Sequence, residues 1–221
     1  MNATSLLHLL QFASPALPIG GYSYSQGLEA ALEENTVHDA DTARSWIAGY
    51  LHEVVARWDA ALFWRLLKAF EADNQTAVAH WSECYLASRD TAESRAETVQ
   101  MGYSLARLLV ELGLADADSL AGDVGLPHAF ARAVHALGIG HEEALLAMLF
   151  ACAENQVLVC VKSVPLGQVA GQRVLLSLRT DIEQAALVAR TLHDDDMSNW
   201  APGLSILSML HEVQQGRLYR S

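Results

Sequence analysis

Apolar residues recur with a helical period along most of this chain. The longest amphipathic segment runs from Asp41, a residue type that caps helices, to about Glu71. Roughly 30 helical residues would extend ~45 Å, which is enough to cross a domain. The apolar positions of this segment are Ala43, Ile47, Tyr50, Val54, Trp58, Ala61 and Leu66. Similar patterns predict helices at 5–13, from Ser23 or Ser25 to about Glu34, from Asn74 through Tyr85, at 91–112, from Pro127 to near Gly138, at 166–178, from Asp181 to Leu192 and at 204–214.

The segment 141–163 has apolar residues on nearly all sides, and Ala144–Ala153 is an uninterrupted apolar run. Such a run has the length of a core helix, whereas a membrane span needs about 20 residues. Residues 157–161 are rich in β-branched side chains and are compatible with a strand, but the chain offers no partner strands. We therefore predict a central buried helix at 141–163.

The least ordinary stretch is Ser14–Glu29, which reads S-P-A-L-P-I-G-G-Y-S-Y-S-Q-G-L-E. Its two prolines and adjacent glycines predict a shaped turn that presents Tyr22 before a helix begins. Elsewhere, Gly113 is expected to end a helix and Pro165 to break the central one. The polar segment 115–125 is the best candidate for a long loop.

These elements predict an all-α, single-domain bundle of about nine to ten helices over residues 1–221. A length of 221 residues fits one large domain, and no repeat or linker divides it. Residues 204–221 are expected to form a C-terminal helix followed by a tail.

Composition narrows the class of protein. Lys and Arg number 14 and Asp and Glu 26, so the formal net charge is 14 − 26 = −12. An acidic surface argues against binding to nucleic acid or to anionic membranes. No Lys or Arg precedes Arg44, so a secretory signal is missing and a soluble cytoplasmic protein is expected. The three cysteines form no disulfide framework, and Cys152 and Cys160 are expected to be buried thiols.

The sequence contains no P-loop, no G-x-S-x-G and no H-E-x-x-H, so no enzyme signature is present. Gly167 and Gly171 favour close helix packing rather than phosphate binding. The nine histidines are dispersed, with no two at i, i+4, and predict neither a bound metal nor a cofactor. The most metal-like cluster is His193–Asp196. It leaves open a metal-dependent hydrolase as the alternative function, although a solvated acidic loop is the preferred interpretation.

The end of the chain is basic and aromatic, which is unusual in such an acidic protein. Arg217 and Arg220 flank Tyr219, and Arg and Tyr are favoured anchors at protein interfaces. A frayed terminus explains the same residues equally well. From residue types alone, both interpretations stay open.

Three stretches together resemble one family, the urease accessory protein F (UreF) family. They are Pro18–Glu29, then Lys162–Gln168 with Gly171 and Gln172, and the ending His211–Glu212 through Arg217–Ser221. Each motif alone is weak, but the series is specific and extends over nearly the whole chain.

The resemblance implies a non-catalytic, all-helical homodimer that takes part in urease maturation. It implies an adaptor that binds the accessory protein called D or H (UreD/UreH) and recruits the GTPase accessory protein G (UreG). The assembly acts on apo-urease and supports nickel insertion, and whether the GTPase is also modulated stays open. Direct nickel carriage by dispersed histidines or cysteines is a further hypothesis.

The partner-binding residues that the resemblance implies lie on all three stretches. They are Tyr22, Ser23, Ser25, Gly27, Glu29, Lys162, Gln168, Gln172, Arg217, Tyr219 and Arg220. The family pattern also matches Leu28, Pro165 and Gly171. This chain departs from the family at Gln215–Gly216, where a glycine loosens the approach to the tail.

Overall fold

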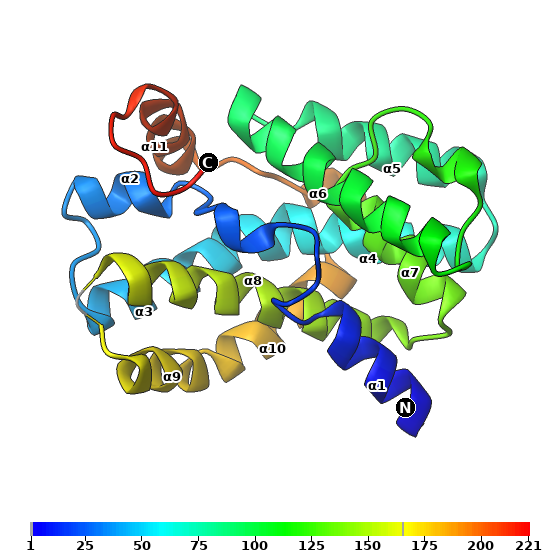
Figure 1. Cartoon of the computed structure of the whole chain (residues 1–221), viewed down its shortest axis with the longest axis horizontal. Coiled ribbons are helices and arrows are strands. Elements are labelled where there is room, and N and C mark those ends of the chain that lie inside the picture. Colours follow the sequence, from blue (N-terminus) through cyan, green and yellow to red (C-terminus); the bar gives the residue numbers. More distant parts are fainter. Residues whose placement is uncertain (1, 165) are drawn as a thin grey trace.

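The computed structural model describes residues 2–164 and 166–221, and within them the chain is helical and contains no strand (Figure 1). Counting α3, η2 and α4 as one continuous helix gives ten helices besides the short 3-10 turns, so the predicted all-α fold is confirmed. The elements are α1 (Ala3–Phe12), η1 (Gly21–Ser23), α2 (Leu28–Glu33), α3 (Ala40–Tyr50), η2 (Leu51–Asp59), α4 (Ala60–Glu71), α5 (Gln75–Ala87), α6 (Ala92–Glu111), η3 (Ala117–Leu120), α7 (Leu126–Ala136), α8 (His141–Ser163), α9 (Gln168–Ser177), α10 (Arg179–Thr191), η4 (Asp194–Asp196) and α11 (Pro202–Val213).

The long amphipathic helix is present, but it is neither capped nor wound as predicted. Asp39 rather than Asp41 is its N-cap, because the Asp39 side chain accepts the Thr42 N–H at 2.8 Å. Its middle third, η2, is π-helical. A π segment widens the turn and shifts the phase of the residues that follow it. Asp59, the last residue of η2, is buried there.

Helix α8 is the central element, as predicted. It contacts α1, α2, α3, α4, α9 and α10, and Figure 1 shows it running through the middle of the molecule. It is long and apolar enough, by length and composition, to pass as a membrane span, with a mean hydropathy of 1.9. Half of that window is buried inside the protein, so its apolar residues supply the core. The segment 157–161 is helical and not a strand. Pro165 lies outside the described residues.

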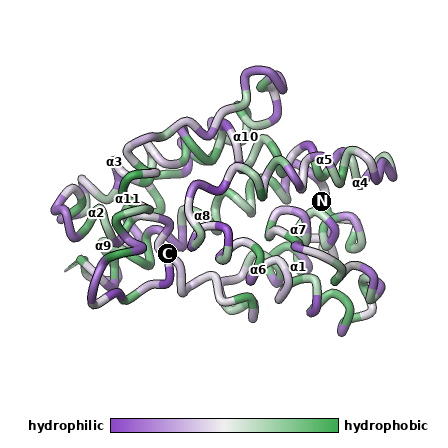
Figure 2. Tube along the Cα trace, turned by 90° about the horizontal axis from the view of Figure 1, so that it is seen from above, coloured by the Kyte–Doolittle hydropathy of each residue, from purple (hydrophilic) through white to green (hydrophobic). Residues whose placement is uncertain are grey.

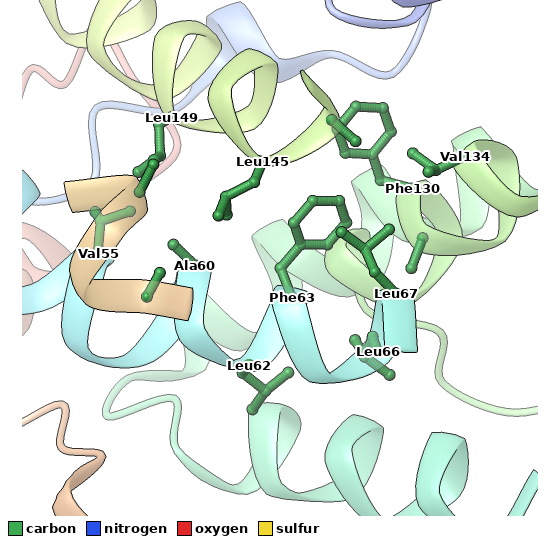
Figure 3. Close-up of a cluster of buried hydrophobic side chains, with 14 of the residues drawn as sticks. Val55, Ala60, Leu62, Phe63, Leu66, Leu67, Phe130, Val134, Leu145 and Leu149 are labelled. Atoms are coloured by element: carbon green, nitrogen blue, oxygen red, sulfur yellow. The ribbon is translucent and has the colours of Figure 1, made fainter. Parts of the chain in front are cut away.

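Aromatic stacking joins α4 and α7 in the core, beside α8. The rings of Phe63 and Phe130 lie 5.4 Å apart and nearly parallel, at 7°. Figure 3 shows them beside Leu145 of α8 and Leu67 of α4. Burying a side chain of this size stabilises the folded protein by about 1.5–3 kcal/mol relative to leaving it exposed. Figure 2 shows the complementary pattern, with hydrophilic segments concentrated in the peripheral loops.

Of the two glycines expected to serve helix packing, Gly171 does so and Gly167, the N-cap of α9, does not, because a Cβ at Gly167 would meet nothing within 4 Å. A Cβ at Gly171 would lie 2.5 Å from Val161 Cγ2, so α9 meets α8 there without room for a side chain.

Asp181 does not cap α10, contrary to the prediction. The helix begins at Arg179, and the Asp181 carboxylate instead accepts Arg44 Nη2 at 2.5 Å and contacts His52 Nε2 at 2.9 Å. This carboxylate joins α10 to α3 and η2.

Candidate functional site

The segment Ser14–Glu29 is a shaped turn that leads into α2. Gly20 and Gly27 have φ of 80° and 82°, in the left-handed region that favours glycine. A Cβ at Gly27 would meet Leu204 Cδ1 at 2.8 Å, so the turn also approaches α11 closely. Gly27 holds the N-cap position of α2, while Ser25 Oγ accepts the Glu29 N–H at 3.2 Å. The prediction that Ser23 or Ser25 is the N-cap of this helix is therefore wrong, although Ser25 Oγ does accept an N–H of its first turn.

The tail lies directly against this turn. Ser25 donates its backbone N–H and its hydroxyl to Ser221 O, at 2.7 and 2.6 Å. The Arg220 N–H donates to Ser23 O at 2.9 Å. These bonds join residues almost two hundred positions apart and place the N-terminal turn and the C-terminal tail on one surface.

A buried carboxylate, Glu29, organises the tail. Its oxygens accept the N–H of Leu218 at 2.6 Å and of Tyr219 at 3.0 Å. Glu29 Oε2 also lies 2.9 Å from His211 Nε2, and His211 Nδ1 lies 2.7 Å from Glu93 Oε2. Both ring nitrogens thus lie within hydrogen-bonding distance of a carboxylate, and the buried imidazole joins Glu29 to Glu93. Glu29 thus holds the tail backbone and α11 together.

A second buried carboxylate, Glu97 of α6, binds the end of the tail. It accepts Ser221 Oγ at 2.5 Å and Gln26 Nε2 at 2.9 Å. Burial raises the pKa of Glu97 above its usual value, and the two hydrogen bonds only partly oppose that effect. On the other side, Gln156 of α8 donates to Ser25 O at 2.9 Å. The turn and the tail are therefore fixed to α6 and α8.

The outward face of this assembly is aromatic and basic. Tyr22 is 60% exposed, and Lys162 Nζ of α8 lies 5.9 Å from its ring centroid. The same ammonium lies 5.8 Å from the Tyr219 ring, which is itself buried beside Leu28 and Val164. Arg220 is exposed on the neighbouring tail segment.

Arg217 has a fixed orientation on this surface. Its guanidinium forms an ion pair with Glu93 and donates to His211 O at 3.3 Å. We call the surface formed by Tyr22, Lys162, Arg217 and Arg220 the turn–tail surface.

The structure brings the predicted residues of the turn and the tail together with Lys162. It does not bring the remaining two predicted residues, Gln168 and Gln172, to this surface. Gln168 and Gln172 are exposed on α9, which packs on α3, α8 and α10. In Figure 1, α9 lies across α3 and α8 from α11. Sequence analysis missed Glu93, Glu97 and Gln156, because they lie on helices whose pattern is otherwise ordinary. In the sequence, Glu29 and His211 were indicated only by the motif segments Gly27–Glu29 and His211–Glu212.

A cavity of about 270 Å³ lies beneath the turn, between α6, α8 and η2. Its wall is largely apolar but includes a buried ion pair, in which Arg89 Nη2 donates to Asp59 Oδ1 at 3.0 Å. The Arg89 guanidinium also stacks over the Tyr85 ring at 4.3 Å. Pairing and stacking compensate for burying the charges, so this polar pair is stably held.

One carboxylate of the acidic loop is already paired with a cation of the chain. Arg65 Nε donates to Asp194 Oδ1 at 2.8 Å. Within residues 2–164 and 166–221, no group of three or more His, Cys, Asp or Glu is arranged to hold a metal ion. The geometry supports a binding surface rather than a reacting centre.

Comparisons with known proteins point to one family over the whole chain. A family model described as UreF matches residues 37–179. The "Urease accessory protein UreF" of Janthinobacterium sp. (strain Marseille) is 62% identical over 226 residues, with 100% of both chains covered. The protein of that name from Nitrosospira multiformis is 56% identical over 223 residues, with 98% of each chain covered. The similarity to these relatives therefore includes the turn and the tail, which lie outside the matched model.

Proposed function

This chain belongs to the UreF family of urease accessory proteins, and on that premise we propose that it is the adaptor of a urease-maturation assembly. The family is non-catalytic. In this proposal the chain forms a homodimer in the cytoplasm and binds the accessory protein D/H. It then recruits the GTPase G, and the assembly inserts nickel into apo-urease.

The turn–tail surface is the proposed recruitment surface for the GTPase. One observation supports this most: the Ser25–Ser221 hydrogen bonds bring motifs from both ends of the chain onto one face. Because the protein as a whole is strongly acidic, the cations Lys162 and Arg220 form a local exception, while Arg217 is held beside them by its ion pair with Glu93. They suit an acidic patch on the partner, and Tyr22 supplies an aromatic anchor.

Helix α11 is the proposed docking element for a protein partner in the same assembly. Its buried residue is His211, whereas Ile206, Met209 and Val213 are exposed. Leu218 of the tail extends the same apolar character. Exposed apolar residues gathered along one helix and its tail favour a protein interface.

Size-exclusion chromatography of the chain with the D/H protein, and then with the GTPase, tests the adaptor function. The wild-type chain is expected to form both complexes in turn. Tyr22→Ala and Arg217→Ala should lose the GTPase and retain the D/H protein. Tyr103→Ala and Arg107→Ala are matched controls, because both side chains are exposed on α6. If the wild-type chain joined neither partner, the adaptor proposal would be wrong.

Point variants test the surface better than removal of the tail. Deleting 217–221 would leave the buried carboxylates of Glu29 and Glu97 without the donors that the tail supplies. An unpaired buried carboxylate destabilises the fold by itself. A truncated chain could therefore fail to assemble for reasons unrelated to recruitment.

A further inference from the structure

One cysteine and one histidine lie a single helical turn apart on α5. His80 and Cys84 are four positions apart, so their side chains project from the same face of the helix. Cys84 Sγ lies 3.7 Å from His80 Nε2 and 4.0 Å from Nδ1. His80 is exposed and Cys84 is half-buried, so solvent reaches the pair.

Cys84 differs from the other two cysteines in its chemistry. Burial raises the pKa of Cys160 to about 12 and raises that of Cys152 still further. Both of these thiols remain protonated at neutral pH and are unsuited to ligate a cation. Cys84 and Cys152 are both partly exposed, and of the two Cys84 is the one with an imidazole beside its sulfur.

We propose that His80 and Cys84 bind a late first-row divalent cation, such as Ni²⁺, Co²⁺ or Zn²⁺, on the surface of α5. Thiolate and imidazole are ligands that such ions prefer. With metal–sulfur and metal–nitrogen bonds of about 2.3 and 2.0 Å, tetrahedral coordination separates sulfur from nitrogen by about 3.5 Å. The observed 3.7 Å lies close to that separation, so rotation of the exposed ring is the main adjustment needed.

The charge of the surroundings favours a cation. Glu83 is exposed on α5 between the two ligands in sequence, and the whole chain has a formal net charge of −12. A negative surface raises the local concentration of divalent ions.

The pair supplies two ligands to the metal ion. So few protein ligands favour exchange of the ion with other molecules over tight retention. Among the described residues no third His, Cys, Asp or Glu completes the group. The other coordination positions are left to water or to a ligand from another molecule, and open positions keep a bound ion accessible. When the ion binds, a sulfur–metal bond replaces the Cys84 S–H and one proton passes to solvent. The neutral His80 ring contributes a lone pair and keeps its own N–H.

Titration of the full chain, kept reduced with a phosphine, with Co²⁺ and with Ni²⁺ tests the proposal. The wild-type chain should develop a near-ultraviolet charge-transfer band from the thiolate–metal bond, and binding should release a proton. Cys84→Ser should abolish the band, and His80→Gln should weaken binding at least about tenfold.

His38→Gln is the matched control, because His38 is also exposed but lies beside Asp39 rather than a thiol. Its band and affinity should match those of the wild type. The variants should also bind the D/H protein normally, since Figure 1 places α5 and α11 toward opposite ends of the molecule. The proposal is overturned if the wild type shows no band, if Cys84→Ser retains it, or if His38→Gln weakens binding as much as His80→Gln.

Discussion

His211 Nε2 lies 2.9 Å from Glu29 Oε2, and both side chains are buried. This contact joins the last helix of the chain to the helix that follows the N-terminal turn. The same Glu29 carboxylate holds two backbone N–H groups of the tail, so one side chain fixes both α11 and the residues after it. The placement of Arg217 therefore depends on Glu29, which holds the N–H of the next residue, Leu218.

Glu29→Gln is expected to loosen the tail. The amide has one carbonyl oxygen in place of two, so at least one of the groups that Glu29 holds, the two tail N–H groups and the His211 ring, loses its acceptor. Leaving a buried hydrogen-bonding group without a partner costs about 1–3 kcal/mol of stability. Hydrogen exchange should show faster exchange of the Leu218 and Tyr219 amides, and GTPase recruitment should fall. Glu33→Gln, at an exposed position of the same helix, is the control. Unchanged tail protection in Glu29→Gln would contradict the role given to this carboxylate.

Tyr22→Ala and Arg217→Ala are expected to weaken GTPase recruitment to a similar degree. Each removes one anchor of the same surface, and interface anchors of these types commonly cost 2 kcal/mol or more, roughly a thirtyfold loss of affinity. Titration of the GTPase against the D/H-bound chain measures the effect, and light scattering should show that the homodimer persists. If only one variant weakens recruitment, the two residues do not share a surface.

Glu97 is expected to make stability depend on pH. Burial raises the pKa of Glu97 in the folded protein. Between the unfolded and the folded pKa, the Glu97 carboxyl therefore keeps its proton in the folded protein and has lost it in the unfolded chain. The stabilising effect is complete below the unfolded pKa and is lost as the pH rises through the higher folded pKa. Urea denaturation from mildly acidic to neutral pH should show the free energy of unfolding falling over this window. The glutamine side chain of Glu97→Gln is neutral at every pH, so the free energy of unfolding of this variant should fall less. Parallel plots of unfolding free energy against pH for the two proteins would contradict the prediction.

Gly27→Ala is expected to destabilise the protein more than Gly113→Ala. Both glycines have positive φ, at 82° and 70°, so both substitutions incur backbone strain of about 1 kcal/mol. Only at Gly27 does the added Cβ also meet a neighbour, Leu204 Cδ1 at 2.8 Å, whereas nothing lies within 4 Å at Gly113. Thermal unfolding of the two variants compares strain alone with strain plus displacement of α11. Equal unfolding midpoints for the two variants would show that α11 moves away from the added Cβ without loss of stability.

Local sequence signals were reliable for the helices and less so for their ends. Periodicity located α8 and the long helix α3–η2–α4, because a helical face repeats within a few residues. The predicted caps at Asp41 and Asp181 were wrong. Asp39 caps α3, and α10 begins two residues before Asp181 with Leu178 at its N-cap position. The Asp181 carboxylate instead contacts Arg44 and His52, which are more than a hundred residues away in the sequence.

The sequence by itself determined the helical class, the central apolar helix, the glycine-dependent turn and, through motif order, the family. The tertiary structure decided that the tail folds onto the turn, that Glu29, His211 and Glu97 hold it there, and that Gln168 and Gln172 lie elsewhere. These outcomes depend on hydrogen bonds between residues up to 196 positions apart, which leave no periodic trace in the sequence. A buried glutamate and an exposed one are identical in the sequence, and only the packing of the folded chain distinguishes them.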